Sequence, residues 1–359
     1  MAYTSIDDPT IYFNTVTYTG DDASTRNITG VGHQPDWVWI KNRGYANKHV
    51  LFDSVRGVNK SVTSDSNAAE VDQNSDGGYV SAFNSDGFTL TEGSSSDNDT
   101  NDDRYTYVAW NWKAGTSFSN DASATSVGTI DSSGSVSTDA GFSIISYTGT
   151  GSAGTIAHGL GAVPKMIITK KRSATQGWHV QHASLGATKE LYLNTNDVAA
   201  TGSTPWNDTT PTSSVFSVGT SGGTNGSSAT YIAYCFADVK GYSKFGSYTG
   251  NGNANGSFVY TGFKPAWLMI KKAADVAESW FMYDNKREDH AGNDRYYALR
   301  PDKTSAENTT YGDNWQLDFL SNGFKLRTTA GHLNNGSFIY MCFAESPFTN
   351  SNGIPNNAE

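Results

Sequence analysis

Apolar and polar residues alternate over short runs along this chain, with a period of two rather than 3.6. Residues 80–90 (VSAFNSDGFTL) and 143–146 (SIIS) are rich in β-branched and aromatic residues, and Gly, Asn, Asp and Ser bound such runs. This pattern is typical of β-strands. Residues 84–88 (NSDGF) and 320–324 (LSNGF) carry the Asp-Gly and Asn-Gly pairs of tight hairpin turns. The pattern predicts an all-β fold of short strands.

One predicted strand, residues 35–41 (PDWVWIK), carries two tryptophans. Alternate side chains of a strand point to opposite faces, so Trp37 and Trp39 share one face while Val38 and Ile40 share the other. Both faces are therefore apolar. The two rings either form a platform for a sugar or lie inside the fold.

The chain contains an internal repeat. The sequence Tyr-Thr-Gly begins at residues 18, 147 and 248, and a proline follows each of its glycines after 15 residues, at Pro35, Pro164 and Pro265. A glycine precedes each proline by three residues, and a lysine follows it by six, at Lys41, Lys170 and Lys271. Each copy closes on an aromatic-rich run, at residues 107–112, 231–236 and 338–343. We predict three tandem β-sandwich-like repeats of about 100 residues each.

The repeat sets the expected domain boundaries. We expect a first sandwich over 1–115, a Ser/Gly-rich linker or edge strands over 116–140, a second sandwich over 141–241, a third over 242–348 and a C-terminal tail over 349–359. Only a short stretch separates the last two sandwiches, so we expect these to be tightly coupled and the first to be more independent. Superposing residues 13–114, 141–240 and 244–346 should bring the three prolines together.

The repeat also bears on the two tryptophans. The second copy has Met166 and Ile168 at the two tryptophan positions, and the third has Trp267 and Met269. A sugar platform would not survive replacement by Met or Ile, whereas a core position would. We therefore predict a strand that is buried on both faces.

Composition excludes several classes of protein. Only 17% of the residues are charged while 13% are aromatic, and a net charge of −10 argues against binding to nucleic acid. No run of about 18 apolar residues occurs, and the N-terminal residues lack the pattern of a signal peptide, so we expect neither membrane insertion nor classical export. Cys235 and Cys342 are too few for a disulfide framework or a four-cysteine zinc site, and we expect buried free thiols.

Candidate chemistry is sparse. No catalytic motif is apparent, so we predict neither catalytic residues nor a bound cofactor, and we expect the seven histidines on loops or at the surface. Residues 72–77 (DQNSDG) resemble the first half of a calcium loop, with Asp72, Asn74 and Asp76 as candidate ligands. The position that should hold the bidentate glutamate is Phe83, so half of the loop pattern is missing.

Several longer strings carry a resemblance to a known family. They are residues 35–43 (PDWVWIKNR), 107–115 (YVAWNWKAG), 231–252 (YIAYCFADVKGYSKFGSYTGNG), 260–267 (YTGFKPAW) and 340–348 (YMCFAESPF). The chain resembles a domain of unknown function that recurs, often in tandem, in tail fibre and other virion proteins of marine tailed bacteriophages. The resemblance covers residues 1 to about 348 and implies a place on a virion, but no catalytic or binding residue.

These observations lead to one expected function and two alternatives. We expect a non-enzymatic virion structural protein, part of a tail fibre or appendage involved in host attachment, that is made in the host cytoplasm. The alternatives are a capsid-decorating protein with a mechanical role and a carbohydrate-binding module. Expected partners are other virion proteins and a host surface glycan or protein. A row of three sandwiches would offer a long contact surface, so we also expect a homo-oligomer, with a trimer favoured by analogy.

Overall fold

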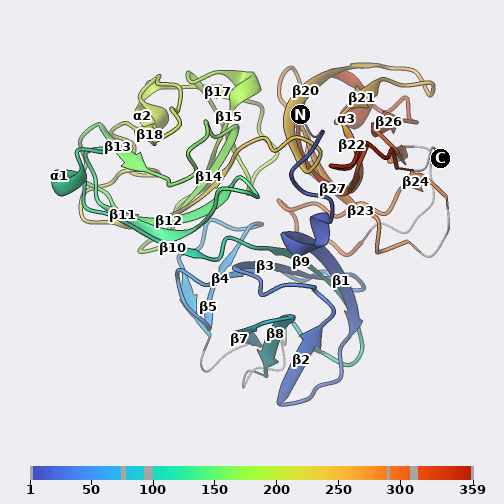
Figure 1. Ribbon diagram of the computed structural model, residues 1–359, viewed down its shortest axis with the longest axis horizontal. Coiled ribbons are helices and arrows are strands. Elements are labelled where there is room, and N and C mark those ends of the chain that lie inside the picture. The colour runs from blue at the N-terminus through green and yellow to red at the C-terminus, as the bar shows by residue number, and fades with distance from the viewer. Residues whose placement is uncertain (1–2, 74–77, 93–99, 289–291, 308–313, 357–359) are drawn as a thin grey trace.

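The computed structural model describes residues 3–73, 78–92, 100–288, 292–307 and 314–356, and the protein is all-β (Figure 1). The first unit holds η1 (Pro9–Ile11), β1 (Phe13–Thr19), β2 (Thr25–Thr29), β3 (Trp37–Asn42), β4 (His49–Asp53), β5 (Lys60–Thr63), β6 (Val71–Asp72), β7 (Tyr79–Asn84), β8 (Gly87–Thr91) and β9 (Thr106–Trp112). Next come β10 (Thr116–Asn120), α1 (Ala122–Thr125) and β11 (Ser132–Ser137). The second unit holds β12 (Phe142–Thr148), β13 (Gly154–Ala157), β14 (Met166–Lys171), β15 (Trp178–His182), η2 (Ala183–Leu185), β16 (Lys189–Tyr192), β17 (Ala200–Thr201), α2 (Ser203–Trp206), β18 (Val215–Val218) and β19 (Thr230–Phe236). The third holds β20 (Ser243–Asn251), β21 (Phe258–Tyr260), β22 (Phe263–Lys272), β23 (Trp280–Asp284), β24 (Asp294–Arg295), β25 (Leu317–Leu320), β26 (Gly323–Leu326), α3 (Gly331–Asn334) and β27 (Asn335–Pro347).

The main sheet of each unit has the same strand order. Its first strand pairs with the last strand of the unit, which pairs with the proline-led strand and then the next strand: β1-β9-β3-β4, β12-β19-β14-β15 and β20-β27-β22-β23. The registers coincide as well, because Trp37 is opposite Trp112, Met166 is opposite Phe236 and Trp267 is opposite Phe343. Each of the three prolines precedes the first of these residues by two positions. That the three units are copies of one fold stays a prediction.

A smaller sheet covers one face of each main sheet. The small sheets are β2-β8-β7, β13-β18 and β21-β26-β25-β24. In the first unit, Val38 and Ile40 of β3 pack with Phe88 and Leu90 of β8 in one buried cluster. Similar clusters lie in the second and third units. Each unit is therefore sandwich-like, with an interior of its own.

The other faces of the three main sheets meet in one shared core. This cluster includes Trp37 and Trp39 of the first unit, Tyr234 of the second, and Trp267 and Phe343 of the third. The ring of Trp37 stacks on that of Tyr234, with centroids 4.4 Å apart. Trp37 and Trp39 are each 1% exposed, and Val38 and Ile40 on the opposite face are each 0% exposed, which confirms that the strand is buried on both faces.

The shared core corrects two expectations about how the units are arranged. Figure 1 shows three lobes around a centre instead of a row: the first unit in blue, the second in green and the third in orange and red. The first unit is not more independent than the others, because its Trp37 and Trp112 contact Tyr234 of the second unit and Trp267 of the third. The short connection between the second and third units does not indicate how tightly these two units are coupled, because the packing of all three units determines the coupling.

The Tyr-Thr-Gly sequence fixes a loop in each unit. The tyrosine hydroxyl donates to a main-chain oxygen directly before a buried asparagine, from Tyr18 to Thr100, Tyr147 to Thr224 and Tyr248 to Leu333, at 2.6–2.7 Å. The glycine backbone lies against the same loop, so that a Cβ atom on Gly20 would lie 1.9 Å from the carbonyl oxygen of Asp102. The repeated motif therefore serves packing of the loop before the last strand.

Residues outside the three units extend them. β10 and β11 pair with each other, and β11 pairs with β12, so residues 116–120 and 132–137 form edge strands of the second main sheet. Near the C-terminus, Ser351 is bonded to Asp7 through its main-chain N–H at 2.7 Å. Within the described residues, no helix is long and apolar enough to cross a membrane.

Candidate functional site

The three repeated lysines lie at the contacts between units. Each lysine lies on the face of its strand that points to the shared core, and each is buried. Lys170 of the second unit donates to the carbonyl oxygen of Asn67 in the first at 3.1 Å, and Lys271 of the third donates to that of Asn196 in the second at 3.3 Å. Lys41 of the first unit donates to that of Thr304 in the third at 3.1 Å. The second unit thus binds the first, the third binds the second and the first binds the third, so the three lysine contacts join the units into a closed ring.

Burial also changes the acidity of two of these ammonium groups. Loss of solvent lowers the pKa of Lys170 to about 8 and that of Lys271 to about 8. Both remain mainly protonated at neutral pH, and each has carbonyl oxygens as acceptors. The lysines therefore act as charged hydrogen-bond donors that hold a loop of the neighbouring unit.

A second set of contacts uses the residue that ends the strand after each lysine. The carboxylate of Asp53 in β4 accepts the hydroxyl of Tyr234 from the second unit at 2.7 Å. The carboxylate of Asp284 in β23 accepts the indole N–H of Trp110 from the first unit at 2.9 Å. His182 occupies this position in the second unit, and its Nε2 lies 3.2 Å from the carbonyl oxygen of Tyr340 in the third. These contacts also close into a ring.

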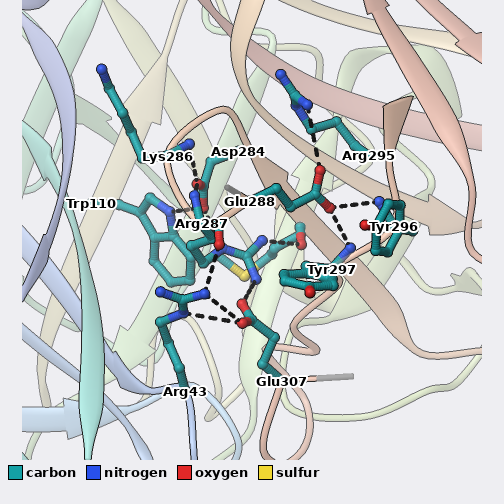
Figure 2. Close-up of polar contacts among 11 residues, drawn as sticks. Arg43, Trp110, Asp284, Lys286, Arg287, Glu288, Arg295, Tyr296, Tyr297 and Glu307 are labelled. Carbon is teal, nitrogen blue, oxygen red and sulfur yellow. Dashed lines mark hydrogen bonds and ion pairs between the residues drawn. The ribbon is translucent and has the colours of Figure 1, made fainter. Parts of the chain in front are cut away.

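Two of the three contacts between units contain a buried ion-pair network. Figure 2 shows the one between the third and first units, where Glu307 binds Arg287 of its own unit and Arg43 of the first. Arg287 also pairs with Asp284 at 2.6 Å. The side chains of Arg287, Asp284 and Glu307 are at most 3% exposed. Such a network holds only if every charge keeps its partner.

The contact between the first and second units repeats this arrangement. Glu70 binds Arg172 of the second unit at 2.8 Å and Arg56 of its own unit at 3.4 Å. Arg56 in turn pairs with the buried Asp53. The same main-chain bond accompanies both networks, from the N–H of Glu70 to Arg172 and from that of Glu307 to Arg43.

Among the described residues, the third contact, between the second and third units, has no such ion-pair network, and Lys271 supplies a charged donor there. Its main-chain bond runs from the N–H of Ala199 to the oxygen of Ala273 at 2.9 Å, so alanines take the places of the glutamate and the interfacial arginine. Leu185 takes the place of Arg56 and Arg287. We did not single out these acids and arginines from the sequence, although residues 49–56 (HVLFDSVR), 178–185 (WHVQHASL) and 280–287 (WFMYDNKR) occupy equivalent places in the three copies and carry Arg, Leu and Arg at their last position.

The expectation that the histidines lie on loops or at the surface is wrong for His49, His179 and His182, which are on buried strands, whereas His33 and His158 do lie on loops. His33, His49, His158, His179 and His182 are all buried, His332 is partly buried and His290 lies outside the described residues. His179 pairs with Glu190 at 2.7 Å through Nδ1, and Gly223 packs directly against its Nε2. The rings of His49, His179 and His182 are buried because the shared core and the small sheets cover both faces of the main sheets.

Burial of these rings predicts sensitivity to acid. Loss of solvent lowers the pKa of His33 to about 4 and that of His182 to about 4, from the ordinary value of 6.5. Between pH 6.5 and 4 the unfolded chain binds more protons than the folded one, so acidification favours unfolding by up to about 3 kcal/mol per ring. Burial raises the pKa of the Asp36 carboxyl, which acts in the opposite direction.

The test isolates one ring. The variant His182→Gln keeps a donor for Tyr340 but does not titrate, so its free energy of unfolding should fall less steeply than that of the parent protein between pH 6.5 and 4. Urea titrations at several pH values measure both slopes. Parallel slopes would show that His182 does not contribute to acid sensitivity.

The calcium prediction concerns a stretch that is mostly outside the described residues. Asn74 and Asp76 belong to that undescribed part, while Asp72 is in β6, exposed, and accepts the side-chain amide of Asn59 at 3.1 Å. Among the described residues, Asp22, Asp102 and Asp103 come close enough to share an ion. Arg104 already neutralises Asp102 and lowers the pKa of that carboxyl, so this acidic cluster is a weak candidate metal site.

An open groove of about 590 Å³ lies beside β11 and β12. Its lining is mainly hydroxyl and carboxylate groups, including those of Asp121, Asp131, Ser133 and Thr148. The ring of Tyr147 is only 4% exposed there. The groove offers hydrogen-bonding groups but no enclosed apolar surface to orient a ligand.

Comparisons with known proteins place the chain in one family. The family model described as "Domain of unknown function (DUF7483)" matches residues 8–347. Searches of curated proteins and of solved structures found no match. The family match spans all three units and their shared core, which is the part of the molecule that the contacts above hold together. The chain therefore belongs to the family described as domain of unknown function DUF7483.

Proposed function

We propose that this protein is a non-enzymatic structural component of a phage particle, part of a tail fibre or another appendage that faces the host. The observation that carries the proposal is the closure of three units around one aromatic core. The three buried lysines and the pairs Glu70–Arg172 and Glu307–Arg43 hold units to one another. Such a rigid block suits mechanical display of outward loops, and the resemblance to virion proteins supports its place on a particle.

The proposed partners follow from the same arrangement. One face of the three-unit block would contact other virion proteins. Its outer loops would contact a glycan or a protein of the host surface. The surface carries few charges and many hydroxyl and amide groups, which favours polar contacts over ion pairs. We also propose a homo-oligomer. The units do not form a row, so the long contact surface on which the sequence-based expectation rested does not support it.

A second candidate function is decoration of the capsid. Ring closure favours it, because one chain already supplies three units around an axis and needs no second copy to complete them. In this role the protein would bind the lattice as a single block. The function would be mechanical, without host contact.

Two measurements test these functions. A cryo-EM reconstruction of the intact virion should show the three-lobed block on the tail for the appendage role, or on the capsid for decoration. Light scattering of the purified chain at micromolar concentration should give an oligomer in the first case and a monomer in the second. Absence of the chain from purified particles by mass spectrometry would overturn both proposals.

A further inference from the structure

Two large aromatic side chains are exposed on one strand of the third unit. Phe258 and Tyr260 flank the buried Val259 in β21, and they are 46% and 54% exposed. Side chains two residues apart on a strand lie on the same face, about 7 Å from each other. β21 belongs to the small sheet, at the upper right of Figure 1, away from the shared core. The pair therefore forms an aromatic surface on the outside of the molecule.

The fold does not require aromatic residues at these positions. In the first unit, Asn27 and Thr29 of β2 take these places, and the side chain of Asn27 accepts the hydroxyl of Thr89 at 2.7 Å. In the second unit the corresponding strand β13 is partly covered, because its Thr155 accepts main-chain N–H groups from residues 129 and 130. Uncovered aromatic rings at these positions are therefore particular to the third unit.

Charged groups surround the two rings. Phe258 lies opposite Lys325 across the strand pair, and the next strand places Asp318 beside that lysine. Asp318 pairs with Arg327 at 2.5 Å. Tyr260 lies opposite Gly323, where a Cβ atom would come within 2.1 Å of a carbonyl oxygen, so no side chain covers the ring from that strand.

The combination of exposed aromatic rings and nearby charged groups favours a saccharide over an apolar protein surface as the ligand. An apolar protein surface placed on the rings would also take Lys325 and Arg327, the more exposed partner of the buried Asp318, out of water, which is costly without new partners. A pyranose ring instead offers an apolar C–H face to the aromatic π surface and hydroxyl groups to the charged rim. The chemistry around the pair therefore favours a saccharide.

The aromatic surface is also held in place. The Tyr260 hydroxyl lies 3.1 Å from that of Tyr3, and Tyr3 donates to the carbonyl oxygen of Gly262 at 2.9 Å. The Nζ atom of Lys240 lies 4.3 Å from the centre of the Tyr3 ring. A platform that is fixed before binding loses little conformational entropy when a ligand arrives.

From these observations we infer that Phe258 and Tyr260 form a saccharide-binding platform on the outer face of the third unit. The inference rests on the proposed attachment role, for which it names the ligand class and the surface. A sugar chain would lie along β21, with its rings stacked on the two side chains and its hydroxyl groups near Lys325 and Arg327.

The test uses the full chain and needs no virion, so its failure is separate from failure of the proposed function. The purified protein is applied to a printed array of bacterial surface oligosaccharides, and the best binder is titrated by calorimetry. We expect Phe258→Ala and Tyr260→Ala each to weaken binding at least tenfold and the double variant to abolish it. Tyr260→Phe should retain most of the affinity, since it keeps the ring.

Matched controls keep the outcome interpretable. Tyr45 is equally exposed, at 54%, but lies on the first unit, so Tyr45→Ala should leave binding unchanged. Thermal unfolding of every variant checks that the fold is intact. No binding to any arrayed glycan, or binding that survives the double variant, would overturn the inference. Loss of self-association in the double variant, seen by light scattering without any glycan binding, would also overturn it and assign the surface to contacts between copies.

Discussion

Replacing Trp37 by alanine should cost about 3–5 kcal/mol of unfolding free energy through the cavity that it leaves. The ring is 1% exposed and contacts Trp39 and Trp112 of its own unit as well as Tyr234 and Phe236 of the second. The lost contacts are therefore shared by two units. Chemical denaturation followed by tryptophan fluorescence measures the change.

The same experiment tests whether the three units unfold together. Trp267→Ala should cost a similar amount, because this ring lies 5.5 Å from that of Trp112 in the same core. Both variants should unfold in one transition, as expected when a single core holds all three units. Tyr45→Ala at the surface is the control and should leave the midpoint nearly unchanged. A loss below about 1 kcal/mol at Trp37, or separate transitions for the units, would contradict the shared core.

Much of the local structure was predictable from the sequence. The period of two, the turn signals and the repeated spacing of Gly, Pro and Lys identified the all-β fold and a strand buried on both faces. The arrangement of the units was not predictable in this way. A strand with two apolar faces shows that something covers each face, but the pattern does not say that Trp37 is covered by Tyr234 of another unit.

The lysines show where the sequence contained more than we drew from it. Lys41 lies on the same face of its strand as Trp37 and Trp39, so a lysine at that position must enter a core. A buried ammonium group needs several acceptors, and the main-chain oxygen of Asn42 at the end of the same strand supplies one of them. The acceptor on the neighbouring unit, Thr304, could not be identified from the sequence because it lies far away along the chain.

The histidines were mispredicted for a related reason. A histidine in a polar, hydroxyl-rich chain was expected to be exposed, but His49, His179 and His182 are on strands of the main sheets. Because the three units close on one another, both faces of these strands are interior. Only the arrangement of units, which the local pattern does not encode, decides whether such a ring is buried.

The buried ion pairs make a second prediction with a large effect. Arg287→Leu should cost about 3–5 kcal/mol, because it leaves Asp284 and Glu307 buried without the cation between them. Leucine is a fair replacement in size, since Leu185 occupies this position in the second unit. The measurement is the free energy of unfolding in urea.

Two further variants decide whether the loss comes from unpaired charge. Lys60→Leu removes a lysine from its pair with the exposed Asp72, and the unfolding midpoint should not change measurably. A fourfold variant, Arg43→Ala, Asp284→His, Arg287→Leu and Glu307→Ala, copies the residues at the contact between the second and third units, where the described residues form no such ion-pair network. It should recover most of the stability that Arg287→Leu loses, because apolar residues of suitable volume can replace a buried charge network. If the single variant is as stable as the parent, or the fourfold variant is less stable than the single one, then the networks do not act as sets of mutually dependent charges.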